Sequence, residues 1–332
     1  MAGVRCLVTG GTGFTGSHLV RRLLDRGHTV GVLDNARGLF WDELERSGAR
    51  LTLGSVTDRE LIDALVPEYE VIFHVAAVFR GVNLPHRVYW EVNVEGTRLL
   101  LDAAFRHKLR RFVYCSTEGV HGHIKNPPAD ETAPIAPKDY YQYSKWEGEK
   151  VVQEYLRLGL PAVILRPTAI YGPGDPERFF LIFKRVKTGV FPIFGSGKTT
   201  YHPLYIDSLS DAFELALSRD QALGQTYIIA DEEYLSIENL VKEVARVMQV
   251  ELRIPHFPFW PLYLAAASCE AVCKPLGITP PLFRRRADWY RQNRAFRIDK
   301  ARRELGYQPR IGLREGLTRT YAWYREQGYL GA

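Results

Sequence analysis

Hydrophobic positions along the chain follow two alternating patterns. Short apolar runs of strand length alternate with longer stretches in which leucines and alanines recur at helical spacing, from residue 3 to about residue 230. The runs predict strands at 4–8, 29–34, 50–54, 71–77, 111–115 and 227–229, and a long helix at about 85–106. Strands that alternate with helices are typical of a parallel sheet with helices on both faces. We therefore expect an α/β fold with about seven parallel strands.

A glycine-rich turn follows the first predicted strand. Its glycines, Gly10, Gly13 and Gly16, stand three residues apart, and a helical pattern begins directly after them. A strand, a tight turn and a helix N-terminus direct free backbone N–H groups at a pyrophosphate, and a Cβ on these residues would block its approach. A glycine motif alone is weak evidence, but this one has the flanking strand and helix that it requires. It predicts a dinucleotide site with Gly10, Gly13, Phe14 and Thr15, on a Rossmann-type doubly wound sheet.

The second predicted strand ends in a carboxylate, Asp34, about twenty residues beyond the glycines. A carboxylate there accepts hydrogen bonds from the adenosine ribose hydroxyls and repels a 2′-phosphate, which favours NAD over NADP. Arg37 is the opposing signal, because an arginine at that place could hold the 2′-phosphate. We predict NAD as the cofactor, with Asn35 beside Asp34 in its site.

Two further strands end in residues that should reach the same site. The predicted strand 71–77 ends in Ala76 and Ala77, which are small enough for the cofactor to approach the backbone. Ser116 and Thr117 directly follow the predicted strand 111–115. In an open parallel sheet, ligands bind outside the carboxyl ends of the strands, so both hydroxyls should face the site.

Tyr141 and Lys145 are four residues apart in a predicted helix, so their side chains share one face. A phenol with a pKa of about 10 is a poor acid or base at neutral pH. A neighbouring ammonium and the positive charge of an oxidised nicotinamide would stabilise the phenolate and bring its pKa nearer the working range. Tyr140 and Tyr143 cannot reach Lys145 in this way. A tyrosine four residues before a lysine also occurs by chance, so this pair alone leaves packing and catalysis equally open.

Composition and charge indicate which partners and which cellular location the protein can have. The chain has 332 residues, of which 46% are hydrophobic, and a net charge of +6 that no nucleic-acid recognition motif accompanies. No apolar signal precedes the first strand, and the stretch 257–269 is too short and too interrupted by proline to span a bilayer. The cysteines, which form no paired framework, are Cys6, Cys115, Cys269 and Cys273. We expect a cytoplasmic protein with reduced thiols, no metal site and no nucleic-acid partner.

Together these residues resemble the extended short-chain dehydrogenase/reductase superfamily, in its NAD-dependent epimerase/dehydratase family. The resemblance covers nearly the whole chain. Besides the residues above, it rests on Asn93, Gly96 and Thr97, and on the segments 165–175, 205–207, 299–301 and 304–307. The number of matching segments, in the family's order, makes this resemblance specific.

The resemblance implies a role for each site residue. Tyr141 would exchange a proton with the reacting hydroxyl or carbonyl, Lys145 would hold the nicotinamide ribose, and Thr117 would hydrogen-bond the substrate oxygen. Pro167 and the backbone after it would pack around the nicotinamide amide. The other implied cofactor contacts are Ser55, Val56, Ala76, Ala77 and Asn93, and the substrate contacts are Phe79, Ser116, Thr117, Thr168 and Tyr201.

Three places depart from the family pattern. Ser55 stands where many members carry an aspartate that binds adenine. Tyr201 or His202 stands where sugar-nucleotide enzymes carry an arginine for the nucleotide phosphate, and Arg285 with Asp288 matches their later arginine–aspartate contact only loosely. These departures weaken a nucleotide-sugar assignment. They strengthen the similarity to 3β-hydroxysteroid- and sterol-dehydrogenase-like members, which have a more apolar C-terminal lobe.

An aromatic, apolar segment at 255–267 and a run of arginines within 284–303 have two interpretations. They could form a hydrophobic substrate mouth with a basic rim that touches a phosphate or an anionic membrane surface. Alternatively, a pair of helices closes the smaller lobe, with the arginines in solvent.

We predict that residues 1–170 form an NAD-binding Rossmann domain and that 171–332 form mainly a smaller C-terminal substrate lobe, with some return to the large domain near 200–230. The expected activity is NAD-dependent hydride transfer on a small-molecule secondary alcohol or ketone, with Tyr141 as acid/base. The alternative is a nucleotide-sugar 4-epimerase or dehydratase with tightly bound NAD. A non-catalytic NAD-binding protein would not need the set of Thr117, Tyr141 and Lys145. The family usually pairs two subunits through helices near 85–106 and 138–158, so the resemblance also implies a homodimer.

Overall fold

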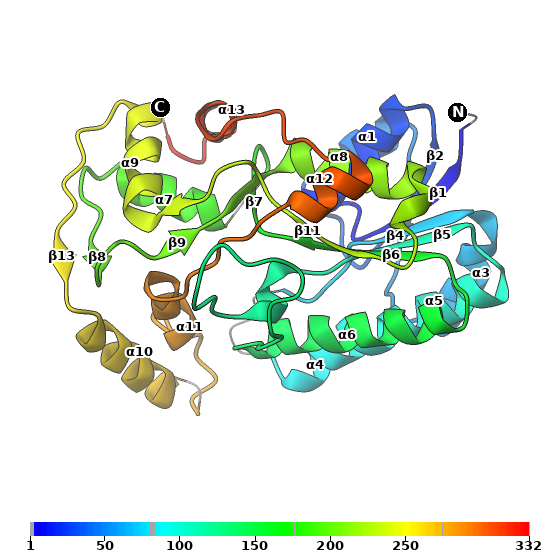
Figure 1. The fold of residues 1–332 in the computed structure, drawn as a ribbon, viewed down its shortest axis with the longest axis horizontal. Coiled ribbons are helices and arrows are strands. Elements are labelled where there is room, and N and C mark those ends of the chain that lie inside the picture. The colour runs from blue at the N-terminus through cyan, green and yellow to red at the C-terminus, as the bar shows by residue number, and fades with distance from the viewer. Residues whose placement is uncertain (1–2, 80–83, 176, 274, 332) are drawn as a thin grey trace.

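The computed structural model describes residues 3–79, 84–175, 177–273 and 275–331. Its centre is a seven-stranded parallel sheet in the order β11-β6-β5-β4-β1-β2-β3 (Figure 1). The strands are β1 (Arg5–Thr9), β2 (Thr29–Asp34), β3 (Arg50–Leu53), β4 (Val71–His74), β5 (Arg111–Cys115), β6 (Ala162–Pro167) and β11 (Thr226–Ile229). The predicted strands are confirmed to within a few residues. The largest difference is in β4, which ends at His74, so Ala76 and Ala77 lie in the loop that follows it.

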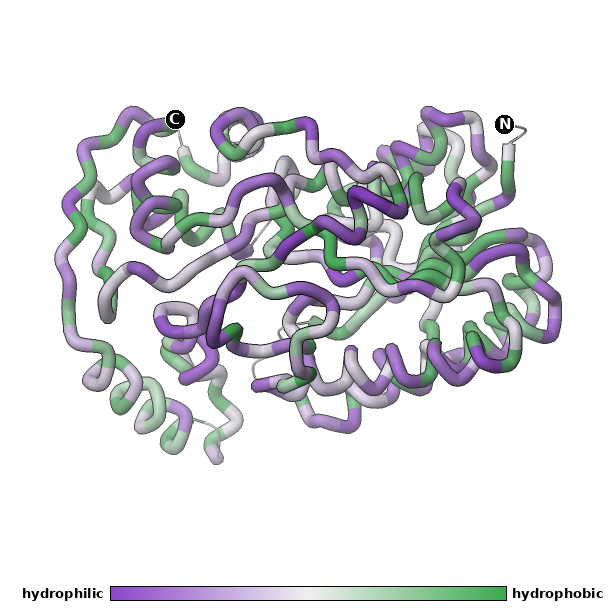
Figure 2. The backbone as a smooth tube through the Cα atoms, in the orientation of Figure 1, coloured by the Kyte–Doolittle hydropathy of each residue, from purple (hydrophilic) through white to green (hydrophobic). Residues whose placement is uncertain are grey.

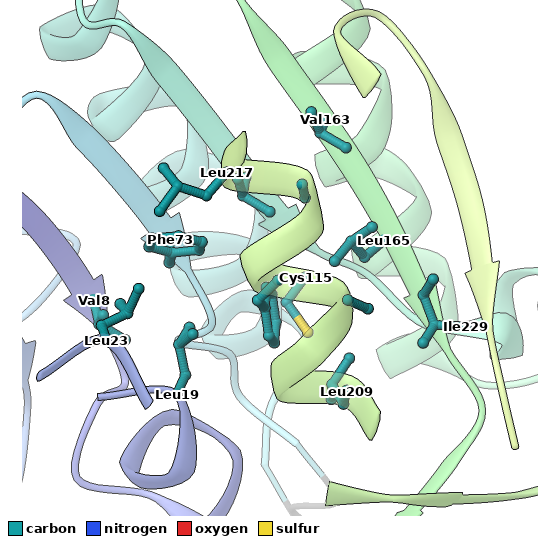
Figure 3. Packing of buried hydrophobic residues seen from close by; sticks show 14 of the residues in the cluster. Val8, Leu19, Leu23, Phe73, Cys115, Val163, Leu165, Leu209, Leu217 and Ile229 are labelled. Carbon is teal, nitrogen blue, oxygen red and sulfur yellow. The ribbon is translucent and has the colours of Figure 1, made fainter. Parts of the chain in front are cut away.

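Helices cover both faces of this sheet. One face packs on α3 (Arg59–Leu65), α5 (Gly96–Arg106) and α6 (Tyr140–Arg157). The other packs on α1 (Phe14–Asp25), α2 (Trp41–Arg46), α8 (Ile206–Ser218) and α12 (Asp299–Leu305). Figure 3 shows α8 lying over the sheet, with Leu209 and Leu217 on the helix and Phe73, Cys115 and Leu165 on the strands. Strands buried on both faces are apolar throughout, which explains why they appear as continuous apolar runs.

The order of the strands fixes the position of the ligand site. From β1 the chain adds β2 and β3 on one side, and then adds β4, β5, β6 and β11 on the other. The direction of winding therefore changes between β1 and β4. Ligands of doubly wound sheets bind in the crevice at the carboxyl ends of the strands beside such a point.

The helix predicted at about 85–106 is interrupted. It consists of α4 (His86–Trp90), a π-helical turn η2 (Glu91–Glu95) and α5. A π turn accommodates an extra residue and rotates the side chains that follow relative to those before it. Asn93 lies within this turn, so a regular helical spacing does not describe its position.

The smaller lobe has its own core. It packs α7 (Arg178–Val186), α9 (Ile237–Met248) and α13 (Leu313–Glu326) around aromatic and aliphatic side chains. Its strand pairs are β7 (Ala169–Tyr171) with β10 (Pro203–Tyr205), β9 (Thr200–Tyr201) with β12 (Leu235–Ser236), and β8 (Ile193–Phe194) with β13 (His256–Phe257). The helix α10 (Phe259–Cys273) lies at the outer edge of the molecule, and α11 (Arg284–Ala287) lies between α10 and the start of α6 (Figure 1). The predicted return of 227–229 to the large sheet is confirmed as β11, whereas the domain boundary at residue 170 stays a prediction.

All four cysteines are free thiols, of which Cys6 and Cys115 are buried. In the part of the chain that the structure describes, no three His, Cys, Asp or Glu side chains are grouped as a metal ion would require. No helix in the described ranges has both the length and the apolar character needed to cross a membrane.

Candidate active site

The glycine turn joins β1 to α1, and its geometry explains the glycines. Gly10 has a φ of +70°, in the left-handed region that glycine adopts without strain. A Cβ on Gly16 would lie 2.1 Å from the carbonyl oxygen of Gly10, so only glycine lets α1 begin this close to the turn. Gly13 precedes the first residue of α1 and lines the cleft described next. The turn thus leaves backbone N–H groups and a helix N-terminus accessible to a phosphate.

A cleft of about 450 Å³ opens at the carboxyl ends of the central strands and joins most of the predicted site. The predicted residues on its wall are Gly10, Gly13, Phe14, Thr15, Asp34, Asn35, Ser55, Val56, Ala76, Ala77, Phe79, Ser116, Thr117, Tyr141, Lys145, Pro167 and Thr168. Two predicted site residues, Asn93 and Tyr201, are not on this wall.

Both exceptions support residues that are on or near the wall. Asn93 is buried, and its side chain accepts a hydrogen bond from the Val78 backbone N–H at 2.8 Å and donates one to the Ser144 hydroxyl at 2.9 Å. It therefore ties the loop after β4 to α6, a role that depends on the π turn. The Tyr201 hydroxyl accepts a hydrogen bond from the Arg178 guanidinium at 3.1 Å, and Arg178 is the residue that lines the cleft.

The adenosine end of the cleft carries the carboxylate that favours NAD. Asp34 Oδ2 accepts hydrogen bonds from the Thr12 backbone N–H at 2.9 Å and from the Thr12 hydroxyl at 2.7 Å, which fix the side chain at the end of β2. The Arg37 guanidinium lies over the Trp41 ring, 5.2 Å from its centroid, and Arg37 is not a lining residue. The structure therefore removes the signal that favoured NADP.

Lys145 provides a direct test of whether a dinucleotide fits. Its side chain is 1% exposed, and within the described ranges its Nζ has no hydrogen-bond partner. The ammonium lies 4.1 Å from the centroid of the Tyr114 ring, and burial lowers the pKa of Lys145 to about 8. Because Lys145 lines the cleft, ribose hydroxyls bound there would supply the missing acceptors. The residues present therefore fit NAD.

The environment of Tyr141 differs from the expectation. Its ring packs edge-on against Phe79, with centroids 4.8 Å apart, and the Arg285 guanidinium lies 5.8 Å from its centroid. Burial raises the pKa of Tyr141, the Cys115 thiol raises it further, and Arg285 acts in the opposite direction. The lowering expected from Lys145 together with an oxidised nicotinamide applies to the enzyme with NAD bound and stays a prediction. In the folded protein, the cost of removing a phenolate from water outweighs the nearby cations.

The two hydroxyls after β5 have different partners. Ser116 donates to Glu149 Oε1 at 2.5 Å, and the Arg166 guanidinium binds both oxygens of the same carboxylate at 2.9 and 2.6 Å. The Ser116 hydroxyl hydrogen is thus directed away from a substrate. Thr117 Oγ1 accepts from the Gly119 N–H at 3.1 Å, which begins the turn η3 (Glu118–His121) and leaves the Thr117 hydroxyl hydrogen for a ligand.

Six charged residues that were not assigned to the site also line the cleft, namely Glu118, Asp175, Glu177, Arg178, Arg285 and Arg294. Glu118 is 4% exposed; its Oε1 lies 3.6 Å from Arg294, and its Oε2 has no hydrogen-bond partner in the described part of the chain. Glu118 could have been suspected because it directly follows Thr117. Arg178 begins α7, shortly after the segment 165–175, and nothing in that segment assigned a role to it.

Comparison with known proteins agrees with this site. The model of the NAD dependent epimerase/dehydratase family matches residues 6–230. The chain belongs to this family. A dTDP-glucose 4,6-dehydratase of Streptomyces niveus is 31% identical over 97% of this chain and 93% of its own length. The 3beta-hydroxysteroid-dehydrogenase/decarboxylase isoform 2 of Arabidopsis thaliana is 29% identical over 95% of this chain, which spans 61% of that longer relative.

A solved structure supports the same assignment. DesIV, a dTDP-glucose 4,6-dehydratase from Streptomyces venezuelae with NAD and TYD bound, superposes with a TM-score of 0.78 and 26% identity, covering 98% of each chain. The protein is therefore an NAD-dependent enzyme of the extended short-chain dehydrogenase/reductase type, as the sequence predicted.

Proposed function

We propose that this enzyme transfers a hydride between NAD and a secondary alcohol or ketone, with Tyr141 as the group that exchanges the proton. The observation that carries the proposal is one cleft that Thr117, Tyr141 and Lys145 share with the glycine turn and Asp34. The turn, Asp34 and Lys145 would hold NAD, which supplies the hydride donor or acceptor when bound. A protein that only senses NAD has no use for a phenol and a hydroxyl that line the same cleft.

The proton step depends on the protonation state of Tyr141. In ketone reduction, the Tyr141 phenol donates its proton to the substrate oxygen, and the Thr117 hydroxyl donates a hydrogen bond to the same oxygen. In alcohol oxidation, the substrate hydroxyl gives its proton to the Tyr141 phenolate. Because burial raises the pKa of Tyr141, the phenol predominates near neutral pH. The phenol that reduction needs is therefore present near neutral pH. Oxidation needs the phenolate, so its rate should rise as the pH rises.

Substitution of Tyr141 tests this proposal. NADH absorbance and product analysis would be recorded with a panel of nucleotide sugars and sterol-like alcohols. Tyr141→Phe keeps the ring but removes the proton donor, so turnover should fall by at least about 100-fold while NAD binding is retained. Tyr143→Phe is the matched control, because Tyr143 lies on the same helix, is 39% exposed and should leave turnover unchanged. Full turnover by Tyr141→Phe would refute the proposal.

A nucleotide-linked sugar is a second candidate, and the charged wall of the cleft favours it. The unpartnered oxygen of Glu118 needs a donor, and a sugar hydroxyl supplies one. A sterol has few hydroxyls, and leaving a buried polar group unpaired costs about 1–3 kcal/mol. Arg178 and Arg294 offer planar, charged donors of the kind that bind phosphate. The relative from Streptomyces niveus carries the name of an enzyme for such a substrate.

The variant Glu118→Gln distinguishes the two candidates. With a nucleotide sugar, loss of the charged acceptor should lower kcat/KM by about tenfold or more. With an apolar alcohol, the neutral amide is less costly to leave unpaired, so kcat/KM should rise. A dehydrogenase forms one NADH for each product, whereas an epimerase or dehydratase that restores its NAD changes the sugar without net NADH.

A further inference from the structure

The helix α10 is apolar around most of its circumference, and its large apolar side chains face outward. Trp260, Leu264 and Val272, which share one side of the helix, are each 63% exposed. The residues that α10 buries are Ala266 and Glu270, on the opposite side. A water-facing helix normally buries its apolar side and exposes its charges.

The inward carboxylate is neutralised within the lobe. Glu270 accepts a hydrogen bond from the Arg284 backbone N–H at 2.8 Å and pairs with the Arg284 guanidinium at 3.0 Å. This arrangement anchors α10 on α11 by its charged side and fixes the apolar side outward. The apolar surface continues beyond α10, because Phe257, Leu276 and Ile278 are 48%, 66% and 53% exposed. Figure 2 shows this hydrophobic helix at the outer edge of the molecule.

The charges around this apolar surface are mostly positive. The segment 256–294 contains six basic residues and two acidic ones, Glu270 and Asp288. Both acids are paired, Glu270 with Arg284 and Asp288 with Arg291 at 2.7 Å. The Arg291 guanidinium also lies over the rings of Phe259 and Tyr263, at 5.2 and 4.9 Å from their centroids. Basic groups therefore border α10 at both of its ends.

We propose that α10, with 276–278 and with Arg284, Arg286 and Arg291 beside them, docks the enzyme on an anionic lipid surface. A short helix with exposed aromatic and aliphatic residues, bordered by arginines, can lie in the plane of the headgroups, and a tryptophan is favoured at that depth. Each basic residue close to an anionic bilayer strengthens binding by about fivefold. Arg285, the neighbour of the anchoring Arg284, lines the active-site cleft. Docking would therefore hold the cleft beside the lipid surface.

Vesicle sedimentation of the full-length protein tests the proposal independently of turnover. The vesicles are phosphatidylcholine alone, and phosphatidylcholine with an equal amount of phosphatidylglycerol, each at low and high salt. The wild-type protein should sediment with the anionic vesicles at least about tenfold more strongly, and salt should weaken this binding. The double variant Trp260→Ser/Leu264→Ser should lose binding by at least about tenfold, because two side chains no longer enter the lipid.

Two controls make the result decisive. Leu158→Ser changes a leucine that is 62% exposed at the end of α6, far along the chain from α10, and should leave vesicle binding intact. Leu264→Phe keeps an apolar group and should also bind. Equal binding to both vesicle types, or undiminished binding by the double variant, would overturn the proposal. The proposal would also be overturned if the wild-type protein does not bind vesicles and forms a dimer that the double variant does not form, as measured by light scattering. In that case α10 would join two copies of the chain.

Discussion

Replacing Lys145 with methionine should stabilise the folded protein while turnover is lost. Lys145 is 1% exposed, and burial lowers its pKa from 10.5 to about 8. A difference of this size corresponds to about 3 kcal/mol of unfavourable free energy for the charged form. The ammonium lies 4.1 Å from the centroid of the Tyr114 ring, and this cation–π contact offsets about 1–2 kcal/mol of that cost. Methionine fills a similar volume without a charge, so the free energy of unfolding should rise by about 2 kcal/mol at neutral pH.

The pH dependence of the free energy of unfolding shows whether the charge of Lys145 causes this difference in stability. The pKa of Lys145 is lower in the folded state than its ordinary value of 10.5, so between about pH 8 and 10.5 the unfolded chain binds more protons. The free energy of unfolding of the wild-type protein therefore rises with pH across this window. The advantage of Lys145→Met should be complete below about pH 8 and should disappear above about pH 10.5.

Urea unfolding followed by tryptophan fluorescence, at neutral and at alkaline pH, measures this difference. The matched control is Lys150→Met in the same helix, where the lysine side chain is 45% exposed and pairs with Glu147. Its free energy of unfolding should change by less than about 0.5 kcal/mol. If Lys145→Met is less stable than the wild-type protein at neutral pH, the buried ammonium is a net stabilising group and our account of it is wrong.

Two further substitutions test the cofactor site and the buried ion pair. Asp34→Ala should reduce the preference for NAD over NADP by about tenfold or more, because a 2′-phosphate no longer meets a carboxylate. Fluorescence titration gives the dissociation constants of the two cofactors. An unchanged ratio of these constants would show that another residue selects the cofactor. Glu149→Gln leaves the guanidinium of Arg166, which is 4% exposed, without its anionic partner, so the free energy of unfolding should fall by about 3–5 kcal/mol. Glu154→Gln, which removes an exposed pair in the same helix, should cost less than about 1 kcal/mol, and similar urea midpoints for the two variants would contradict the burial argument.

The cofactor half of the cleft was predictable because its determinants are local in the sequence. Gly10 to Gly16 form one continuous turn, and Asp34 ends the next strand, so spacing alone relates them. The sheet was predictable for a similar reason, since strands buried on both faces are uniformly apolar. The resemblance assigned Asn93 to the cofactor, but the contacts of its side chain with Val78 and Ser144 come from other segments and could not be inferred from its place in the sequence. The burial that raises the pKa of Tyr141 in the chain without cofactor was not visible in the sequence, because it depends on segments far from Tyr141.

Most charged residues of the cleft wall were not predicted as site residues, because the fold brings them together from distant segments. Glu118 comes from the turn after β5, Arg178 from α7, and Arg285 from α11. The Arg285 guanidinium also pairs with Asp139 at 2.8 Å, and Asp139 caps the helix that carries Tyr141. One short helix, α11, thus contacts the start of the catalytic helix through Arg285 and anchors the exposed α10 through Arg284. The proposed substrate site and the proposed docking surface therefore share α11, and Arg285 is the side chain through which we expect a change at the surface to reach Tyr141.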